Sequence, residues 1–192
     1  TRSVKDLMTY LRKTNSKYAG ETSIVGEIIK TAPRYTLAIE AALGGFIGNV
    51  ITATDQQAKD LIGILKTHNM GRCTFLPRNV IKANRIKLPA FKTARVLGFA
   101  AELVQTEPQY REIIDSILAR TLVVETMNEA VNAARETGYK IKIVTLEGDV
   151  IASGGAMTGG SAKTQKAGII TRKAEIETLE TGIAENRQRS EG

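Results

Sequence analysis

The sequence contains little that could build a covalent or metal-dependent site. It has one cysteine, Cys73, one histidine, His68, and no tryptophan. A single cysteine excludes a disulfide within the chain and argues against a cysteine metal cluster, and a single histidine excludes any site that needs two. No apolar run approaches the roughly 20 residues that a membrane helix requires, and no signal-peptide pattern is seen. We therefore expect no membrane partner and a reducing, cytoplasmic setting.

Acidic residues are also missing from long stretches of the chain. The 192 residues carry 27 Lys and Arg against 20 Asp and Glu, a formal net charge of +7. No acid lies between Asp60 and Glu102, a stretch with eight basic residues, and another acid-free stretch runs from Asp149 to Glu175. Clustered basic charge attracts polyanions such as a phosphate backbone. The same clusters also fit a solvated surface, so charge alone leaves both interpretations open.

Strand-like and helix-like segments alternate through the middle of the chain, which predicts an α/β fold. Segments rich in β-branched residues are typical of strands, and they occur at residues 24–30, 49–53, 72–76, 122–125 and 140–146. Proline is favoured in the first turn of a helix and threonine caps its start. Four helices are therefore predicted to begin at Pro33, Thr54, Pro108 and Thr126.

An internal repeat is visible in the predicted helices. The pattern P-x-Y-x3-I-x3-L begins at Pro33 and again 75 residues later at Pro108. Each copy is followed by a strand-like segment, a capping threonine and an alanine four residues on, now offset by 72 residues. We interpret the body as two pseudo-repeated subdomains with small mixed sheets, joined by the basic linker from Pro77 to about Gly98.

Both ends of the chain carry apolar residues spaced three and four apart among charges, at 4–11 and 176–183. This spacing is typical of a coiled-coil seam, although each run is too short to be stable alone. An ordinary amphipathic helix is the alternative for either end. Together the two ends predict short antiparallel coiled-coil stubs, so that the chain divides into 1–20 (stub), 21–98 (subdomain I with linker), 99–162 (subdomain II) and 163–192 (junction and stub).

Residues 153–161, SGGAMTGGS, contain four glycines within seven positions. A phosphate-binding P-loop requires G-x4-G-K-[ST], but Gly160 stands at the lysine position and Lys163 follows Ser161. A small phosphate- or nucleotide-binding α/β protein is therefore the weaker alternative. Paired glycines allow another backbone to approach closely, including an edge strand of a second chain, and we favour this interpretation.

No catalytic arrangement can be assembled around the remaining reactive side chains. His68 lies at the end of a predicted helix, and Cys73 lies inside a predicted strand as a small packed residue. Neither shares a motif with a carboxylate pair. The sequence therefore predicts no catalytic residue, no metal site and no cofactor.

Coiled-coil ends around a duplicated α/β body that ends in G-G-x-M-T-G-G-S resemble the hinge domain of bacterial SMC (structural maintenance of chromosomes) proteins, the condensin ATPases. The resemblance extends from residue 24 to 161, and its matching stretches are AIEAALGG at 38–45, GRCTFLP at 71–77, LVV at 122–124, IVTLEGDV at 143–150 and GGAMTGGS at 154–161. The chain departs from the family at Cys73, where alanine is usual, and at 91–98, where the family linker varies.

The resemblance implies a ring-like homodimer that joins two SMC chains in chromosome condensation and segregation. It places the dimer contact at Gly154, Gly155, Met157, Gly159 and Gly160. It also implies sequence-independent DNA binding where the body meets the coiled coil, at the basic residues Lys163, Lys166, Arg172, Lys173, Arg12, Lys13 and Lys17. ATP hydrolysis and the kleisin and accessory subunits would belong to parts outside this chain, which is expected to be nucleoid-associated and not itself an enzyme.

Overall fold

The computed structural model describes residues 1–160 and residue 170. One order of elements occurs twice along the chain, as the repeat predicts. Each copy contains a short strand, a 3-10 turn, a second short strand, another 3-10 turn, a helix, a strand, a helix and a final strand. We name the copies unit I, residues 23–77, and unit II, residues 98–145.

The bounds of the elements follow the repeat. The strands of unit I are β1 Ser23–Ile24, β2 Lys30–Thr31, β3 Val50–Thr52 and β4 Phe75–Pro77, its helices are α2 Thr36–Leu43 and α3 Asp55–Thr67, and its 3-10 helices are η2 Val25–Glu27, η3 Pro33–Tyr35 and η4 Gly44–Gly48. The strands of unit II are β5 Gly98–Phe99, β6 Val104–Gln105, β7 Thr121–Val124 and β8 Lys142–Thr145, its helices are α4 Arg111–Leu118 and α5 Met127–Glu136, and its 3-10 helices are η5 Ala100–Leu103 and η6 Pro108–Tyr110. Outside the units lie α1 Arg2–Lys13, η1 Lys17–Gly20, β9 Val150–Ile151 and β10 Met157–Thr158.

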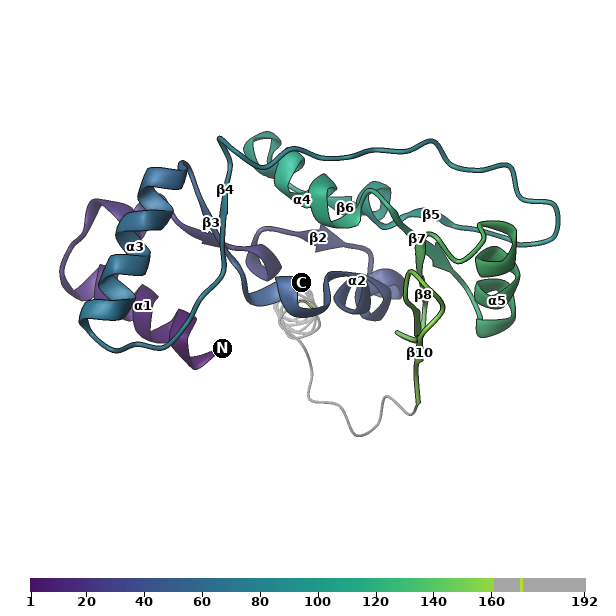
Figure 1. The fold of residues 1–192 in the computed structure, drawn as a ribbon, viewed down its shortest axis with the longest axis horizontal. Coiled ribbons are helices and arrows are strands. Elements are labelled where there is room, and N and C mark those ends of the chain that lie inside the picture. The colour runs from purple at the N-terminus through teal and green to yellow at the C-terminus, as the bar shows by residue number, and fades with distance from the viewer. Residues whose placement is uncertain (161–169, 171–192) are drawn as a thin grey trace, which may run out of the picture.

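The molecule is elongated, with α1 and α3 at one end, α5 at the other and α2 and α4 between them (Figure 1). Each unit builds a sheet in which the central strand pairs antiparallel on one side and parallel on the other. Unit I stops at the order β1-β3-β4, whereas the sheet of unit II continues past β8 to give β10-β9-β8-β7-β5. The registers correspond, since Ile24 pairs with Val50 in unit I and Phe99 with Leu122 in unit II.

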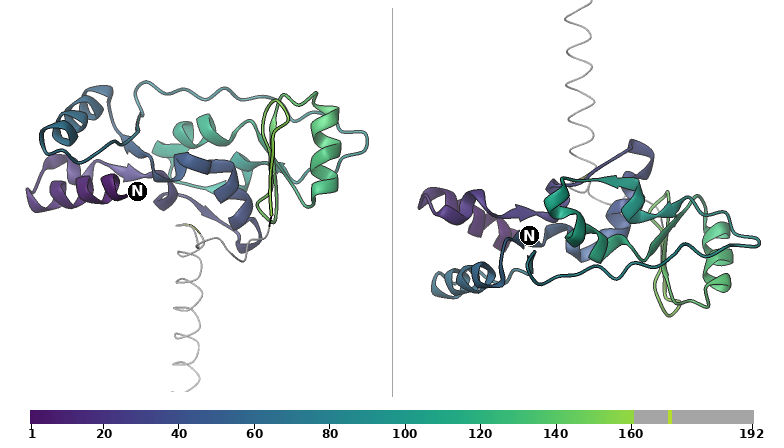
Figure 2. Two further views of the ribbon diagram at one scale, coloured as in Figure 1. Left: turned by 60° about the horizontal axis from the view of Figure 1, so that its bottom comes forward. Right: turned by 90° about the horizontal axis from the view of Figure 1, so that it is seen from above.

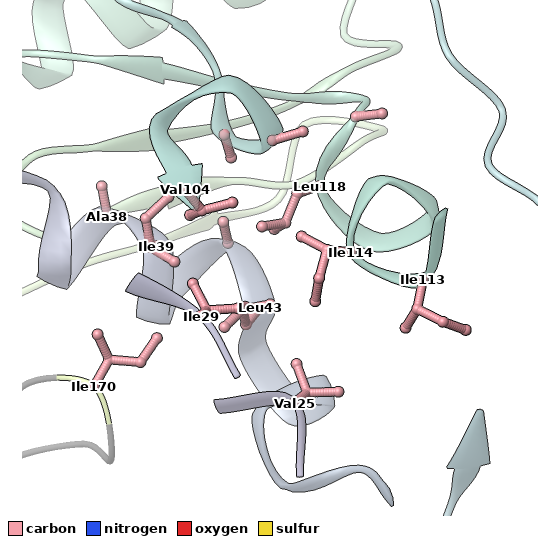
Figure 3. Close-up of a cluster of buried hydrophobic side chains, with 14 of the residues drawn as sticks. Val25, Ile29, Ala38, Ile39, Leu43, Val104, Ile113, Ile114, Leu118 and Ile170 are labelled. Atoms are coloured by element: carbon pink, nitrogen blue, oxygen red, sulfur yellow. The ribbon is translucent and has the colours of Figure 1, made fainter. Parts of the chain in front are cut away.

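The main hydrophobic core lies between the units, and both contribute equivalent side chains to it (Figure 3). Burial of these side chains is the main force that holds the units together. Five pairs of core residues are related by the 75-residue offset: Val25 and Ala100, Ile29 and Val104, Ala38 and Ile113, Ile39 and Ile114, Leu43 and Leu118. The repeated Ile and Leu of the sequence pattern are therefore core residues in both units.

A two-stranded ladder between β2 and β6 also joins the units. Thr31 Oγ1 donates a hydrogen bond to the carbonyl oxygen of Leu103, 2.7 Å away. Thr106 Oγ1 donates the equivalent bond to the carbonyl oxygen of Ile28, at 2.8 Å. Each threonine thus bonds to the other unit, as a pseudo-twofold relation between the units requires.

Lys142 adds a further contact between the units. Its Nζ, on β8, donates a hydrogen bond to the carbonyl oxygen of Ala42, 2.9 Å away in the last turn of α2. A cation is favourable at a helix C-terminus, where carbonyl groups lack partners within the helix. Burial lowers the pKa of Lys142, so this contact holds a charge that is partly removed from water.

The first helix packs against unit I. Leu7 and Leu11 of α1 are fully buried and form a separate cluster with Leu61 and Leu65 of α3. The apolar row at residues 4–11, predicted as a coiled-coil seam, therefore contacts α3. Its predicted partner at 176–183 lies outside the described residues, so the antiparallel stubs stay a prediction.

Two of the predicted strands differ in the structure. Residues 24–30, predicted as one strand, form β1, η2 and β2, because the two ends of the segment pair with different strands. The strand predicted at 72–76 begins later, at Phe75, and includes Pro77. Proline lacks a backbone N–H and is tolerated here because β4 is an edge strand.

Candidate functional site

The glycine-rich segment forms a hairpin at the edge of the unit II sheet. β10 pairs antiparallel with β9, and Met157 lies opposite Ile151. In the connection between them, the Gly154 N–H donates to the carbonyl oxygen of Tyr139 at 2.7 Å, and the Gly155 N–H donates to that of Ala152 at 2.9 Å. The first bond fixes the hairpin beside the end of α5, and the second closes its turn.

The structure gives the glycines of this hairpin a role within the chain. Gly154 and Gly155 have φ angles of +96° and +107°, a region that side-chain-bearing residues rarely adopt, so the turn itself requires glycine. At Gly159 an added Cβ would lie 2.5 Å from Asp149 Oδ1, so the chain's own carboxylate fills that space. Contact with a second backbone is therefore not needed to explain these glycines, and it stays a prediction.

The outer edge of the hairpin is exposed. β10 is the last strand of its sheet, and 56% of Met157 is accessible although its neighbour in register, Ile151, is fully buried. Exposed edge strands carry unpaired backbone groups and readily accept another strand. β10 thus combines an open backbone edge with a large exposed apolar side chain.

A second open edge lies at β4, the last strand of the unit I sheet. Beside it is a hollow of about 300 Å³, which is lined by three apolar or small residues before the strand and on it and by four residues of α3: Cys73, Phe75, Pro77, Asp55, Ala58, Lys59 and Ile62. Ile62 is 41% exposed. In Figure 1, β4 and β10 lie on either side of α2, so the two edge strands are well separated in the molecule.

The predicted basic junction is only partly described. Arg12 and Lys13 are exposed in the last turn of α1, and Lys17 is exposed just beyond it. Basic residues at this end of a helix also stabilise it, which is a structural reason for the first two. The other four predicted DNA-binding residues, Lys163, Lys166, Arg172 and Lys173, lie outside the described residues.

The basic linker contains no helix or strand at residues 78–97 and runs along α4 before turning back beside α5 (Figures 1 and 2). Carboxylates of both helices hold its backbone. Glu136 accepts hydrogen bonds from the amides of Lys92, Thr93 and Ala94 at 2.6, 3.3 and 2.9 Å. The amide donors, Ala94 first, hold the pKa of Glu136 below its usual range.

The other end of the linker is held by α4. Glu112 accepts from the Ala83 amide at 2.8 Å, and the Arg85 guanidinium pairs with Glu112 at 2.8 Å and with Asp115 at 2.9 Å. The Arg85 hydrogen bond, followed by that of the Ala83 amide, lowers the pKa of Glu112. The sequence pattern did not indicate these contacts, because a carboxylate that binds a distant backbone amide leaves no signature in residue spacing.

The reactive side chains of the described residues form no catalytic cluster. The His68 ring packs on Tyr10, with ring centroids 4.5 Å apart. Burial raises the pKa of the Cys73 thiol, which disfavours the reactive thiolate. Residues 1–160 contain no group of three His, Cys, Asp or Glu side chains arranged to hold a metal ion, and no helix in that range is long and apolar enough to cross a membrane.

The phosphate-binding alternative receives no support from the described part of the glycine segment. Residues 154–160 form a turn and an edge strand. A P-loop leaves its backbone amides free to surround the phosphate, whereas Met157 and Thr158 are paired in a ladder with β9. The geometry therefore favours a protein contact at this edge.

Comparisons with known proteins agree with this geometry. Residues 19–134 match the family model described as "SMC proteins Flexible Hinge Domain". The chain is 36% identical over 188 residues to the chromosome partition protein Smc of Desulfitobacterium hafniense. The aligned region covers 97% of this chain and 16% of that protein. It therefore spans about one sixth of the length of such relatives.

Two solved structures share the fold. An asymmetric dimer of the Geobacillus stearothermophilus SMC hinge domain matches with a TM-score of 0.75 and 32% identity, over 97% of this chain and 83% of that one. The Pyrococcus furiosus SMC hinge domain matches with a TM-score of 0.63 and 28% identity, over 87% of this chain and 93% of that one. The small mixed sheets of units I and II are thus those of hinge domains.

Proposed function

Because the chain belongs to the SMC hinge domain family, we propose that it joins two copies of itself through the open edges β10 and β4. The observation that carries the proposal concerns two of the edge strands in the described residues: β4 borders a hollow, and β10 carries the exposed Met157. If β10 of each copy pairs with β4 of the other, a twofold axis relates two equal contacts and the assembly closes. Pairing would extend the short sheet of unit I by strands of the partner.

The dimeric Geobacillus stearothermophilus hinge supports self-association of this chain. Relatives named chromosome partition proteins support a role in bacterial chromosome segregation. We propose that the chain serves chromosome condensation as well and acts at the nucleoid. Within such a longer protein, this chain would connect two subunits at the far end of their coiled-coil arms. ATP hydrolysis, and contacts with kleisin and accessory subunits, would belong to other parts of that protein.

Hydrogen exchange tests the edge pairing. Backbone amides that enter a ladder exchange more slowly, so amides of β10 and β4 should gain protection when the protein is concentrated from monomer to dimer. The opposite edge strands, β1 and β5, serve as internal controls and should not change. A dimer in which β4 and β10 exchange as fast as in the monomer would contradict the proposal.

We also propose that the junction of body and arms binds DNA without sequence preference. The exposed cluster of Arg12, Lys13 and Lys17 supports this, together with the basic residues at 163–173. Each phosphate that a basic side chain neutralises releases counterions from the DNA. The slope of log affinity against log salt should therefore become shallower by about 0.9 for each phosphate that a variant no longer neutralises.

Charge reversal with a matched control tests the DNA site. Changing Arg12, Lys13 and Lys17 to Glu should weaken duplex binding and flatten its salt dependence, and the same change at 163, 166, 172 and 173 should do so further. The control reverses three exposed linker residues: Lys87, Lys92 and Arg95. An equal weakening in the control and junction variants would show that the junction is not the site.

A further inference from the structure

The duplication provides a template for the hollow beside β4. Helix α3 corresponds to α5 with an offset of 72 residues, since Thr54 and Thr126 cap them in the same way. Val50 of unit I corresponds to Leu122 of unit II. Val50 pairs with Phe75 and Leu122 pairs with Ile143, so Phe75 corresponds to Ile143. Each position around the hollow therefore has a counterpart in unit II.

In unit II this place is filled by the chain's own β9. Ile151 lies opposite Ile143, is fully buried, and belongs to one cluster with Ala130 and Ala134 of α5. That cluster also contains Ile141, the counterpart of Cys73. The face of the unit II sheet that is covered by α5 is thus closed by an aliphatic side chain from the next strand.

In unit I no strand of the described residues occupies the corresponding position. The counterparts of Ala130, Ala134 and Ile143 are Ala58, Ile62 and Phe75, and these line the hollow of about 300 Å³. No strand of the described chain follows β4 in its sheet. Ile62 remains 41% exposed, whereas its counterpart Ala134 is fully buried.

We propose that this hollow is the seat of Met157 of the partner subunit. Met157 is 56% exposed, and its register with Ile151 places it on the same face of the unit II sheet as that residue. A β10 strand of the second copy, paired on β4, would present Met157 to α3 as β9 presents Ile151 to α5. The inference rests on the proposed dimer, and it identifies Met157 as the side chain that anchors that dimer.

The chemistry of the two surfaces fits this exchange. Methionine is unbranched and flexible, and it fills irregular apolar gaps better than a β-branched residue. Seating it would bury two large apolar side chains, Met157 and Ile62, that the single chain leaves exposed. Apolar anchors that enter a pocket at the centre of an interface carry most of its affinity. A twofold dimer would contain two such seats.

Cross-linking to Cys73 tests the seat directly. Cys73 is the sole cysteine of the chain and lines the hollow, so a Met157→Cys variant treated with a short bismaleimide should give a covalent dimer. A maleimide spacer is preferred because diagonal neighbours in a sheet have Cβ atoms about 7 Å apart, beyond the reach of a disulfide. Mildly alkaline buffer offsets the raised pKa of the Cys73 thiol.

Two controls define the result. Thr158→Cys places the thiol on the opposite face of β10 and should cross-link far less, and Cys73→Ser in the Met157→Cys background should abolish the product. If sedimentation shows a dimer but Met157→Cys cross-links no better than Thr158→Cys, the seat is wrong and the proposed dimer stands. If the protein sediments as a monomer throughout, both proposals fail.

Affinity measurements provide a second test. Met157→Asp should weaken the dimer roughly a hundredfold, because each of two buried apolar side chains is replaced by a charge, whereas Met157→Leu should change it less than tenfold. Ile62→Asp, on the other side of the seat, should weaken it similarly. Since both residues are exposed in the single chain, the variants should keep the melting temperature of the monomer. Unchanged dimer affinity in Met157→Asp would overturn the proposal.

Discussion

Units I and II follow the same path through the same order of elements, yet they complete their sheets differently. Unit II adds β9 and β10, so that Ile151 covers the face beneath α5. Unit I ends at β4 and leaves a hollow beneath α3. The helices that correspond in the two units, α3 and α5, also differ. Helix α5 packs on its sheet through small alanines, whereas α3 carries Leu61 and Leu65, which α1 covers.

The difference shows how a duplicated body can become an interaction module. Two units that both closed their own sheets would form a self-sufficient monomer. Here one unit has an extra edge strand and the other has a vacant edge, so a second copy can complete what each chain lacks. The shared core is symmetric, and the proposed contacts with a second copy lie where the symmetry is broken.

Substitutions at equivalent core positions should lower the free energy of unfolding by equal amounts, and these should be the largest effects on stability. Leu43 and Leu118 occupy matching places in the core and are almost fully buried. Leu43→Ala and Leu118→Ala should each lower the free energy of unfolding by about 2–5 kcal/mol, because each removes buried methyl groups and leaves a cavity. Urea unfolding at one fixed protein concentration measures both. A large loss of stability at one position alone would show that the core is not shared evenly.

Packing of helix α1 should stabilise unit I more than unit II. Leu7→Ala removes a fully buried side chain from the α1–α3 cluster, and we expect the free energy of unfolding to fall by about 2–3 kcal/mol, at the lower end for such changes. Hydrogen exchange should accelerate in α3 and not in α5. Equal acceleration in both helices would contradict the division of the clusters.

The two threonine caps should contribute equally to the free energy of unfolding, and less than the core leucines. Thr54 Oγ1 accepts from the Gln57 amide at 3.1 Å, and Thr126 Oγ1 accepts from the Glu129 amide at 3.3 Å. Replacing either by Ala should cost about 1 kcal/mol by thermal or urea unfolding. Thr67→Ala, at the far end of α3, is the matched control and should cost less than either cap.

The smallest effect is expected at the linker, where Glu136 of unit II accepts three backbone amides. Amide donors lower the folded-state pKa of this carboxylate, so its stabilisation is present above the ordinary glutamate pKa of about 4.3 and is lost as pH falls through the folded-state pKa. Wild type should therefore exceed Glu136→Gln in stability at neutral pH and lose that advantage in strong acid. An advantage independent of pH in urea titrations would show that the carboxylate charge is irrelevant.

Local sequence signals were sufficient for much of the body. The repeat, the capped helices and the strands at 49–53, 122–125 and 140–146 were predictable because proline, capping threonine and runs of β-branched residues act within a few residues of themselves. Core residues such as Ile39 and Ile114 followed from helical spacing.

Features that depend on distant partners were not predictable in this way. The segment 24–30 is divided because its two ends pair with strands far apart in the sequence. The hollow beside β4 is visible only when both sheets are compared. The glycines at 154–155 signalled a special backbone conformation, but spacing alone could not separate a tight turn from a close contact with another chain.

Sedimentation equilibrium over a range of concentrations decides whether this chain associates with a second copy, as completion of unit I by a partner strand requires. We expect a species of twice the 20.8 kDa mass of the single chain, which dissociates on dilution. A mass of 20.8 kDa at every concentration would contradict it.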